Sequence, residues 1–125
     1  MRLLLDTHIL LWLMQDNTRL TQRARGIIDN SAEVCVSVAS IWEIAIKWRL
    51  GKIEENPQDV VAVMEKAGLI EVPVSRQHAV ATSRLPLIHN DPFDRLLVAQ
   101  AISETMRLLT ADPRLAAYSE LVLTV

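Results

Sequence analysis

The stretch that decides the fold is residues 2–14, which read Arg-Leu-Leu-Leu-Asp-Thr-His-Ile-Leu-Leu-Trp-Leu-Met. The first four residues form a short, mostly apolar segment typical of a buried strand, and the segment from Thr7 to Met14 predicts a helix. Asp6 stands between the two. Because a buried charge is costly without a partner, an acid at the end of an apolar strand is a candidate for a functional site.

The alternation of strand and helix continues along the chain. Further strands are expected at Val34–Val38, Leu69–Val74, Arg107–Thr110 and Leu121–Val125. Further helices are expected at Thr21–Asp29, Ala39–Leu50, Pro57–Gly68, Arg76–Arg84 and Pro92–Met106, with a helical turn at Pro113–Tyr118. This order predicts an α/β fold in which a mostly parallel β-sheet is sandwiched by helices. In such sheets, ligands bind beyond the carboxyl ends of the strands.

Length and composition bound the class of protein. With 125 residues, half of them hydrophobic, the chain is expected to form one domain over residues 1–125. No segment approaches the roughly 18 to 20 apolar residues that cross a bilayer, so we expect a soluble, cytoplasmic protein with no membrane association. Cys35 is the single cysteine and is expected to be a buried strand residue.

The formal charge of -2 is a mild argument against a generally basic nucleic-acid-binding protein. The argument is mild because bound cations would offset part of the negative charge. Setting four metal-bound acids aside leaves 11 of the 15 acidic residues against 13 basic ones. The local distribution of charge therefore matters more than the total.

Four acidic residues each follow or interrupt an apolar segment: Asp6, Glu43, Asp94 and Asp112. Asp6 and Asp112 leave the carboxyl ends of two expected strands, whereas Glu43 and Asp94 lie near the starts of helices at the same edge of the sheet. Two carboxylates about 5 Å apart repel by roughly 3 kcal/mol at an effective dielectric constant near 20, so their convergence needs compensation. Oxygen ligands suit Mg²⁺ or Mn²⁺. We therefore expect one carboxylate-lined metal site.

The acids also have structural interpretations. Asp91 and Asp112 each precede a proline, as a helix N-cap followed by proline in the first turn would, and Asp6 could cap the helix that follows it. Asp94 would then be an acid favoured by the helix dipole. For Asp112 the sequence supports capping and ligation equally, and for Asp91 it favours capping. The coincidence of all four acids is what favours the metal site.

Four motifs follow one another along nearly the whole chain. They are Leu5-Asp-Thr-His8, Ser40-Ile-Trp-Glu-Ile-Ala-Ile-Lys47, His89-Asn-Asp-Pro-Phe-Asp-Arg-Leu-Leu-Val-Ala-Gln-Ala101 and Leu109-Thr-Ala-Asp112. In this order they resemble the successive motifs of PIN-domain ribonucleases and, more narrowly, of VapC-type toxins. Each motif alone is weakly specific, whereas four in order are a strong signal.

The resemblance implies a site and an activity. Asp6, Glu43, Asp94 and Asp112 correspond to the catalytic and metal-binding acids of the family. Thr7, Ser40 and Thr110 are supporting hydroxyls, and Asp91 could supply or support the third ligand. The implied function is a Mg²⁺-dependent endoribonuclease, with Mn²⁺ as a substitute, that is the toxin of a toxin–antitoxin pair. Its expected partners are RNA, a cognate antitoxin and a second copy of the chain in a homodimer.

Several basic residues near the expected site are candidates for contact with substrate phosphate. They are His8, Arg84, His89 and Arg95, with Lys47 as a further candidate. Each has an ordinary alternative, because an isolated histidine usually forms structural hydrogen bonds, surface arginines are usually solvated, and Lys47 could pair with Glu43 one helical turn away.

Two other classes of function compete with the nuclease. A noncatalytic PIN-like module that binds RNA or protein would share the fold, although the intact acids disfavour it. A phosphatase of the haloacid-dehalogenase type would carry a second aspartate two residues after Asp6, where this chain has His8. No glycine-rich phosphate loop or serine nucleophile motif is present in the sequence.

Overall fold

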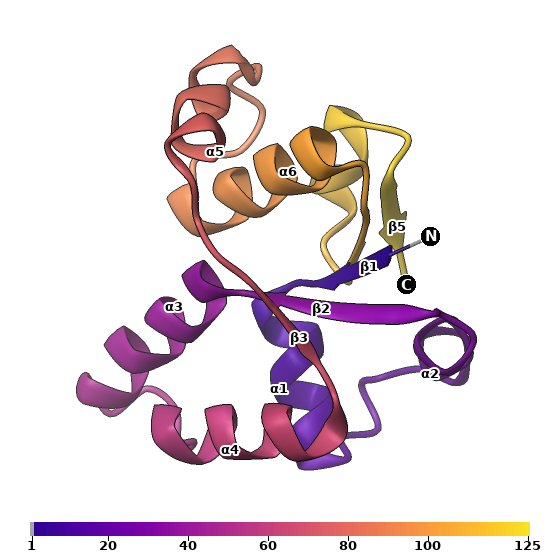
Figure 1. The fold of residues 1–125 in the computed structure, drawn as a ribbon, viewed down its shortest axis with the longest axis vertical. Helices are drawn as coiled ribbons and strands as arrows, with labels where there is room; N and C mark the ends of the chain where they lie inside the picture. The colour runs from indigo at the N-terminus through magenta and orange to yellow at the C-terminus, as the bar shows by residue number, and fades with distance from the viewer. Residues whose placement is uncertain (1) are drawn as a thin grey trace.

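The computed structural model describes residues 2–125 and contains a five-stranded sheet (Figure 1). The strands are β1 (Arg2–Leu5), β2 (Glu33–Ser37), β3 (Ile70–Val72), β4 (Arg107–Thr110) and β5 (Val122–Thr124). Their order across the sheet is β3-β2-β1-β4-β5, and all four pairings are parallel. The predicted sheet is confirmed.

Helices connect the strands, as a parallel sheet requires. They are α1 (Thr7–Gln15), α2 (Gln22–Asp29), α3 (Val38–Arg49), α4 (Pro57–Ala67), α5 (Arg76–Ala81) and α6 (Pro92–Glu104), with 3₁₀ turns η1 (Thr82–Arg84) and η2 (Pro113–Tyr118). The first half of the chain builds the sheet from β1 outward to β3, and the second half adds β4 and β5 on the other side of β1. The strand order therefore reverses between β1 and β4, where α/β proteins open a crevice for ligands.

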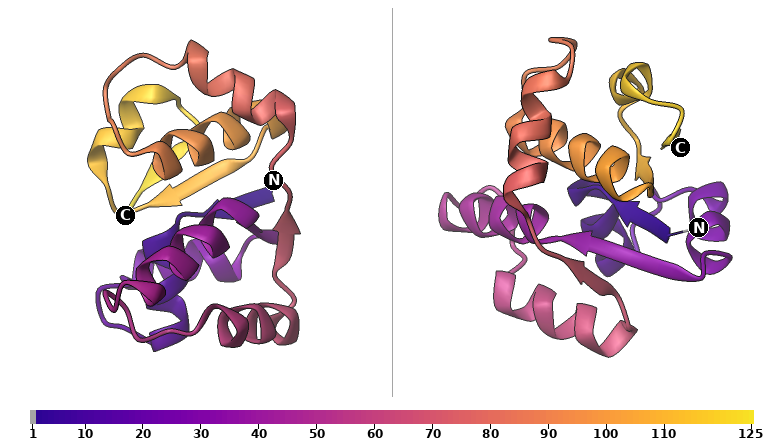
Figure 2. Two further views of the ribbon diagram at one scale, coloured as in Figure 1. Left: turned by 90° about the vertical axis from the view of Figure 1, so that its left-hand side faces the viewer. Right: turned by 45° about the horizontal axis from the view of Figure 1, so that its top comes forward.

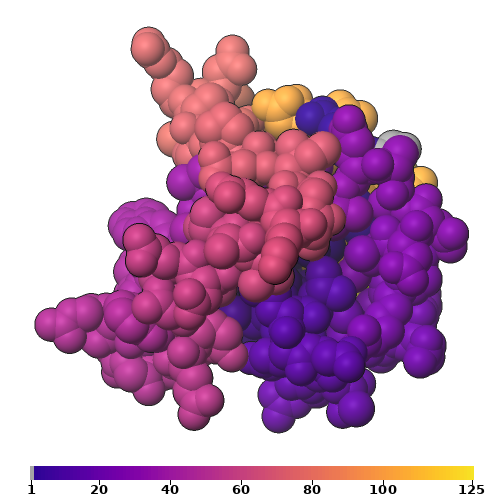
Figure 3. Space-filling view, turned by 60° about the horizontal axis from the view of Figure 1, so that its bottom comes forward, coloured from indigo at the N-terminus to yellow at the C-terminus, as the bar shows by residue number. Residues whose placement is uncertain are grey.

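The sheet is covered on both faces because successive strand residues point to opposite sides. Leu3 and Leu5 of β1 pack with α1, α2, α3 and α4 in one apolar cluster, whereas Leu4 packs with α6 and η2 in another. Two further views show α6 and α5 on one side of the sheet and α1 and α4 on the other (Figure 2). In the space-filling view α1 lies between α2 and α4, and these helices close the first face (Figure 3). Cys35 is buried in the second cluster, as expected.

Small differences from the expected boundaries have local causes. Val38 begins α3 instead of ending β2, because the Ser37 hydroxyl accepts a hydrogen bond from the backbone N–H of Ala39 and caps the helix. α6 ends before Met106 because Thr105 adopts a left-handed conformation with φ of 52°. Gly68, with φ of 75°, ends α4 as predicted.

None of the helices found in residues 2–125 is long and apolar enough to cross a membrane.

Candidate functional site

Asp6 leaves the carboxyl end of β1 and caps α1. Its Oδ1 accepts a hydrogen bond of 2.8 Å from the backbone N–H of Ile9, and its Oδ2 accepts one of 2.5 Å from the Thr110 hydroxyl at the end of β4. The side chain is 3 % exposed. Both predicted roles are therefore compatible, because an aspartate that caps the helix still has lone pairs directed to the site.

Asp112 follows β4, the neighbour of β1. Its Oδ1 accepts hydrogen bonds from the backbone N–H of Arg114 at 3.0 Å and from Nε of the same residue at 3.1 Å, while its Oδ2 accepts one from the Arg114 guanidinium at 2.8 Å. The backbone N–H of Asp112 donates to the Thr110 hydroxyl at 3.0 Å. Thr110 thus orients the carboxylate of Asp6 and accepts from the backbone of Asp112, which supports its predicted role beside the acids.

The start of α6 brings two more carboxylates. Asp91 is the N-cap and accepts hydrogen bonds from the backbone N–H groups of Phe93 at 2.8 Å and of Asp94 at 3.1 Å. Asp94 lies in the first turn, where its Oδ2 is 2.9 Å from Nε2 of His89. Because an ionised carboxylate only accepts hydrogen bonds, this His89 nitrogen carries a proton whenever Asp94 is charged. The predicted cap at Asp91 is confirmed.

Glu43 lies in α3 and is 5 % exposed. Its Oε1 accepts a hydrogen bond of 2.6 Å from the Thr7 hydroxyl, and its Oε2 is 2.9 Å from Nζ of Lys47. The Thr7 hydroxyl also lies 3.0 Å from the Ser40 hydroxyl. The pair with Lys47 is therefore real but partly buried rather than on a solvated face, and Lys47 neutralises Glu43 instead of pointing to solvent as a free cation.

A pocket of about 330 Å³ opens at this edge of the sheet. The described residues that line it are Asp6, His8, Trp12, His89, Asp91, Asp94, Ala111, Asp112 and Arg114. One polar atom each of His89, Asp94 and Asp112 lies within 4.8 Å of the others, close enough to share one cation. Glu43 is not among the lining residues, although its charge acts on Asp94. Three of the four predicted acids thus line the same pocket.

Burial and mutual repulsion show in the titration of these groups. Burial raises the pKa of Asp6 to about 6, although the hydrogen bonds from Thr110 and Ile9 oppose the rise. Burial also raises the pKa of Asp94, and the nearby charges of Asp91 and Glu43 add to the effect. The hydrogen bonds from Arg114 instead hold the pKa of Asp112 below its usual value. Asp6 and Asp94 therefore keep their negative charges at a cost in free energy.

The donor set fits a hard divalent cation. Asp6, Asp94 and Asp112 supply oxygens, as Mg²⁺ and Mn²⁺ prefer, and the pocket leaves room for water on such an ion. His89 adds an imidazole to the cluster, but its nitrogen already contacts Asp94 and orients that carboxylate. Hydrogen bonds of this kind from neighbouring residues commonly orient the side chains that bind a metal.

Of the four predicted phosphate-binding residues, two lie at the pocket and two do not. His8 and His89 both line it, although 81 positions separate them in the sequence. Arg84 is exposed in η1 and lines a different hollow, beside α5. Arg95 donates hydrogen bonds to the backbone carbonyls of Thr82 and Pro86, both at 2.9 Å, and its guanidinium is thus turned to the preceding loop.

Those hydrogen bonds give Arg95 a structural role. Its guanidinium also donates to the carbonyls of Leu85 and His89 and to the hydroxyl of Tyr118, which accepts a further bond from the backbone N–H of His89. Arg95 therefore fixes the loop that carries His89. The structure favours this positioning role over the phosphate contact that the sequence suggested.

Arg114 is the charged residue of the pocket lining that sequence reasoning missed, alongside Trp12 and Ala111. It is exposed, with 64 % of its side chain accessible, and it lies two residues beyond Asp112. An arginine directly after an aspartate and a proline at a strand end carries no distinctive spacing, so only its contact with Asp112 identifies it.

Comparison with known proteins gives consistent matches. The family described as "PIN domain" matches residues 3–121. A curated relative, Ribonuclease VapC22 of Mycobacterium tuberculosis, is 29 % identical over 117 residues, which cover 92 % of this chain and 90 % of the relative.

Two solved structures share the fold. The crystal structure of VapBC2 from Rickettsia felis, bound to a DNA fragment from its promoter, has a chain that superposes with a TM-score of 0.72 at 16 % identity, covering 98 % of this chain and 97 % of that one. A toxin–antitoxin complex from Klebsiella pneumoniae gives a TM-score of 0.67 at 18 % identity, with coverages of 97 % and 95 %.

Proposed function

This chain belongs to the PIN domain family, and from that premise we propose that it is a Mg²⁺-dependent endoribonuclease and the toxin of a toxin–antitoxin pair. The relative named Ribonuclease VapC22 supports the activity, and the fold shared with toxin–antitoxin proteins supports the biological role. The expected place of action is the cytoplasm, where RNA and an antitoxin would meet the protein.

The observation that carries the proposal is the convergence of carboxylates from three separate segments. Asp6 follows β1, Asp94 lies in α6 and Asp112 follows β4, yet all three line one pocket of about 330 Å³. The raised pKa values of Asp6 and Asp94 mean that the folded protein keeps these charges at a cost. A protein tolerates such repulsion where a bound cation relieves it.

The residues of the pocket have distinct roles in this proposal. Asp6, Asp94 and Asp112 would hold the cation, and Glu43, paired with Lys47, keeps Thr7 in place. A bound Mg²⁺ or Mn²⁺ would lower the pKa of a water molecule and stabilise charge on the scissile phosphodiester.

The chain's own groups orient the acids and would contact the substrate. The Ile9 N–H and the Thr110 hydroxyl fix both oxygens of Asp6. His8 and Arg114 stand at the pocket with polar side chains that are exposed enough to meet the phosphates of an RNA strand. Because water is the nucleophile, no serine or cysteine is needed, and the products carry 5′-phosphate and 3′-hydroxyl ends.

Apolar surface on α3 and α4 supports the proposed protein partners. Ile41, Pro57, Val61 and Ala62 line a mostly apolar hollow of about 460 Å³, which suits a segment of an antitoxin. Trp42, on the same helix as Ile41, is 61 % exposed and contacts Phe93 edge to face. Large exposed aromatic side chains are enriched in protein interfaces, including those of homodimers.

A cleavage assay with a matched pair of variants tests the activity. Single-stranded RNA is incubated with the purified protein in Mg²⁺, in Mn²⁺ and in EDTA, and the 5′ ends of the products are analysed. We expect cleavage only with metal, loss of cleavage in Asp94→Asn, and retention in Asp91→Asn, because asparagine caps a helix as well as aspartate does.

The same assay separates the nuclease from the noncatalytic alternative. RNA that is bound but not cut in Mg²⁺ or Mn²⁺ would identify a binding module. Loss of cleavage in Asp91→Asn, with the fold intact, would instead show that Asp91 is itself a ligand.

A further inference from the structure

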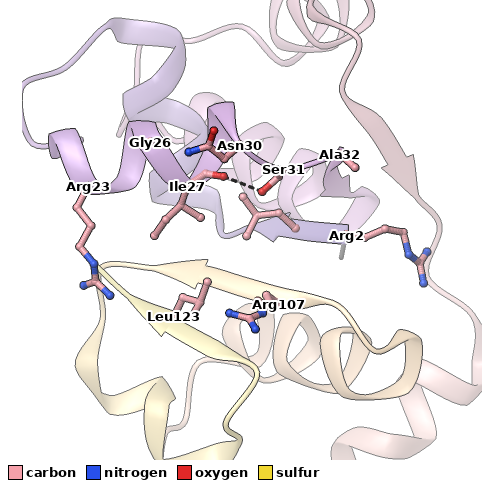
Figure 4. A pocket seen from close by; sticks show the side chains of 10 residues that line it. Arg2, Arg23, Gly26, Ile27, Asn30, Ser31, Ala32, Arg107 and Leu123 are labelled. Atoms are coloured by element: carbon pink, nitrogen blue, oxygen red, sulfur yellow. Dashed lines mark hydrogen bonds between the residues drawn. The ribbon is translucent and has the colours of Figure 1, made fainter.

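A second pocket, of about 650 Å³, lies between α2 and the strands β1, β4 and β5 (Figure 4). This second pocket lies toward the amino ends of β1 and β4, because Arg2 and Arg107 at the starts of these strands line it. The acidic pocket opens at their carboxyl ends. The size of the second pocket is in the range that holds one small ligand. The proposed nuclease chemistry uses none of its residues.

Three arginines line this pocket, which we call the arginine pocket, and no acid is among the described residues that line it. Arg23 of α2 donates one hydrogen bond of 2.9 Å to the carbonyl of Thr124 in β5, and Arg107 of β4 lies beside Leu123 (Figure 4). Arg2 turns away from them and donates a hydrogen bond of 2.7 Å to the carbonyl of Glu104. In a chain of net charge -2, this is a local concentration of positive charge.

Gly26 gives the arginine pocket a second unusual feature. It lies inside α2, where glycine is less favourable than alanine by about 1 kcal/mol. No requirement of the fold explains it, because a Cβ built on Gly26 meets no atom within 4 Å and its backbone is helical. Its absent side chain instead opens the wall of the pocket to close approach by a ligand.

The remaining surface suits the apolar part of such a ligand. Leu3, Ile27 and Leu123 line the pocket beside the arginines, and the register of β1 with β4 sets Leu3 directly beside Arg107. The last turn of α2 also borders it, and the carbonyl dipoles at a helix C-terminus disfavour an anion. Binding of an anion here would therefore depend on the arginines.

We propose that the arginine pocket binds a nucleotide, with its phosphate on Arg23 and Arg107 and its base or ribose against Ile27 and Leu123. Arginine is the side chain best suited to phosphate oxygens, because its planar donors match their geometry. The phosphate comes from one of two sources, an RNA strand or a free mononucleotide. Binding of an RNA strand in this pocket rests on the proposed function, whereas binding of a free mononucleotide does not.

The RNA source is consistent with the distance between the two pockets. Arg2 and Asp6 are four residues apart on and just beyond β1, which corresponds to about 13 Å along an extended strand. A segment of RNA longer than the part that is cleaved would meet both edges of the sheet. The arginine pocket would then add affinity without touching the scissile bond.

A nuclear magnetic resonance titration locates the ligand directly. The metal-free protein in EDTA, which cannot cleave RNA under the proposal, receives either 5′-AMP or a ten-nucleotide oligouridine. We expect shifts of the backbone amide signals of Gly26, Ile27 and Asn30. Shifts with AMP identify a free mononucleotide as sufficient, and shifts with the oligonucleotide alone identify the RNA backbone as the source.

Two variants at one position isolate the effect of charge. Gly26→Gln and Gly26→Glu add side chains of equal size into open space, and both should raise the melting temperature because both residues favour helix more than glycine does. We expect Gly26→Glu to weaken binding of the responding probe about tenfold more than Gly26→Gln, the order of a charge-assisted contact. Fluorescence anisotropy with the labelled probe measures the dissociation constant of each variant.

A third variant removes an arginine directly. Arg23→Glu should also weaken binding and, with oligouridine, lower the slope of log affinity against log salt by about 0.7, whereas the exposed loop variant Arg19→Glu, with the same change in charge, should not lower it. Equal affinities of Gly26→Gln and Gly26→Glu, or amide shifts confined to the acidic pocket, would overturn the proposal. Neither result would bear on the proposed nuclease function, because metal-dependent cleavage is measured separately.

Discussion

Replacing Asp6 by asparagine removes a buried negative charge while it keeps the shape and the hydrogen bonds of the side chain. The asparagine Oδ1 can still accept from the Ile9 N–H, and its amide can donate to the Thr110 hydroxyl. In the absence of metal, the variant should therefore be more stable than the wild type at neutral pH. The reason is the cost of keeping an ionised carboxylate at a site that is 3 % exposed.

The size and sign of the effect follow from the pKa of Asp6. Burial raises it from 3.8 to about 6, so between these values the folded protein holds a proton that the unfolded chain has released. The contribution of Asp6 to the free energy of unfolding then falls as pH rises through this range, by about 3 kcal/mol in total. At pH 4 the two proteins should have nearly equal stability, and at pH 8 the wild type should be less stable by about 3 kcal/mol.

Urea unfolding followed by tryptophan fluorescence measures this difference in EDTA between pH 4 and pH 8. Asp94 titrates in both proteins, so subtraction leaves the contribution of Asp6 together with its coulombic coupling to Asp94. Addition of Mn²⁺ should reverse the order, since a ligand at one thousand times its dissociation constant stabilises the folded state by about 4.1 kcal/mol and Asp6→Asn binds it poorly. A stability difference that stays constant with pH would refute the reasoning.

Other variants test the remaining groups. Thr110→Val removes the hydroxyl that donates to Asp6, so the pKa of that carboxyl, followed by carbon-detected magnetic resonance, should rise further; an unchanged value would show that the hydroxyl contributes nothing. Arg114→Ala removes the guanidinium from both oxygens of Asp112 and leaves only the backbone N–H of residue 114 on Oδ1, so calorimetry should show tighter Mn²⁺ binding, and weaker binding would contradict competition between the two cations. Asp112→Asn keeps the cap and should change stability in EDTA by less than about 0.5 kcal/mol, yet Mn²⁺ should raise the melting temperature of the wild type more; equal rises would leave only the cap. Expression of the wild type should arrest bacterial growth while Glu43→Gln does not, and equal toxicity would point away from the acids.

The elements of the fold could be predicted because their signals are local. Asp91 before a proline and Gly68 after an apolar helix mark boundaries that depend only on nearby residues, and both were located correctly. The acids could be singled out for the same reason, since Asp6 directly follows an apolar strand and becomes a buried residue at its carboxyl end.

Contacts between distant segments could not be predicted in this way. Arg95 is a candidate for phosphate contact by its place in the sequence, but the carbonyls that hold it belong to a loop whose path depends on tertiary packing. The pair of Lys47 with Glu43 and the place of His8 and His89 beside the acids could be suggested from the sequence, but the partial burial of that pair could not, because it depends on packing between helices. That β4 would be placed beside β1 is a property of the whole sheet and has no local signal.

The hydrogen bond from Thr110 to Asp6 joins residues that are 104 positions apart. A ribosome makes the Asp6 end of the chain first, and at 5 to 20 residues per second it needs roughly 5 to 20 seconds to add the residues that lead to Thr110. During this interval, and afterwards until β4 enters the sheet beside β1, the acids of the site are not assembled. Under the proposed function, a nascent, truncated or misfolded copy would consequently be harmless to the cell's RNA, and the time before β4 docks would be time in which an antitoxin can be made and can find the chain.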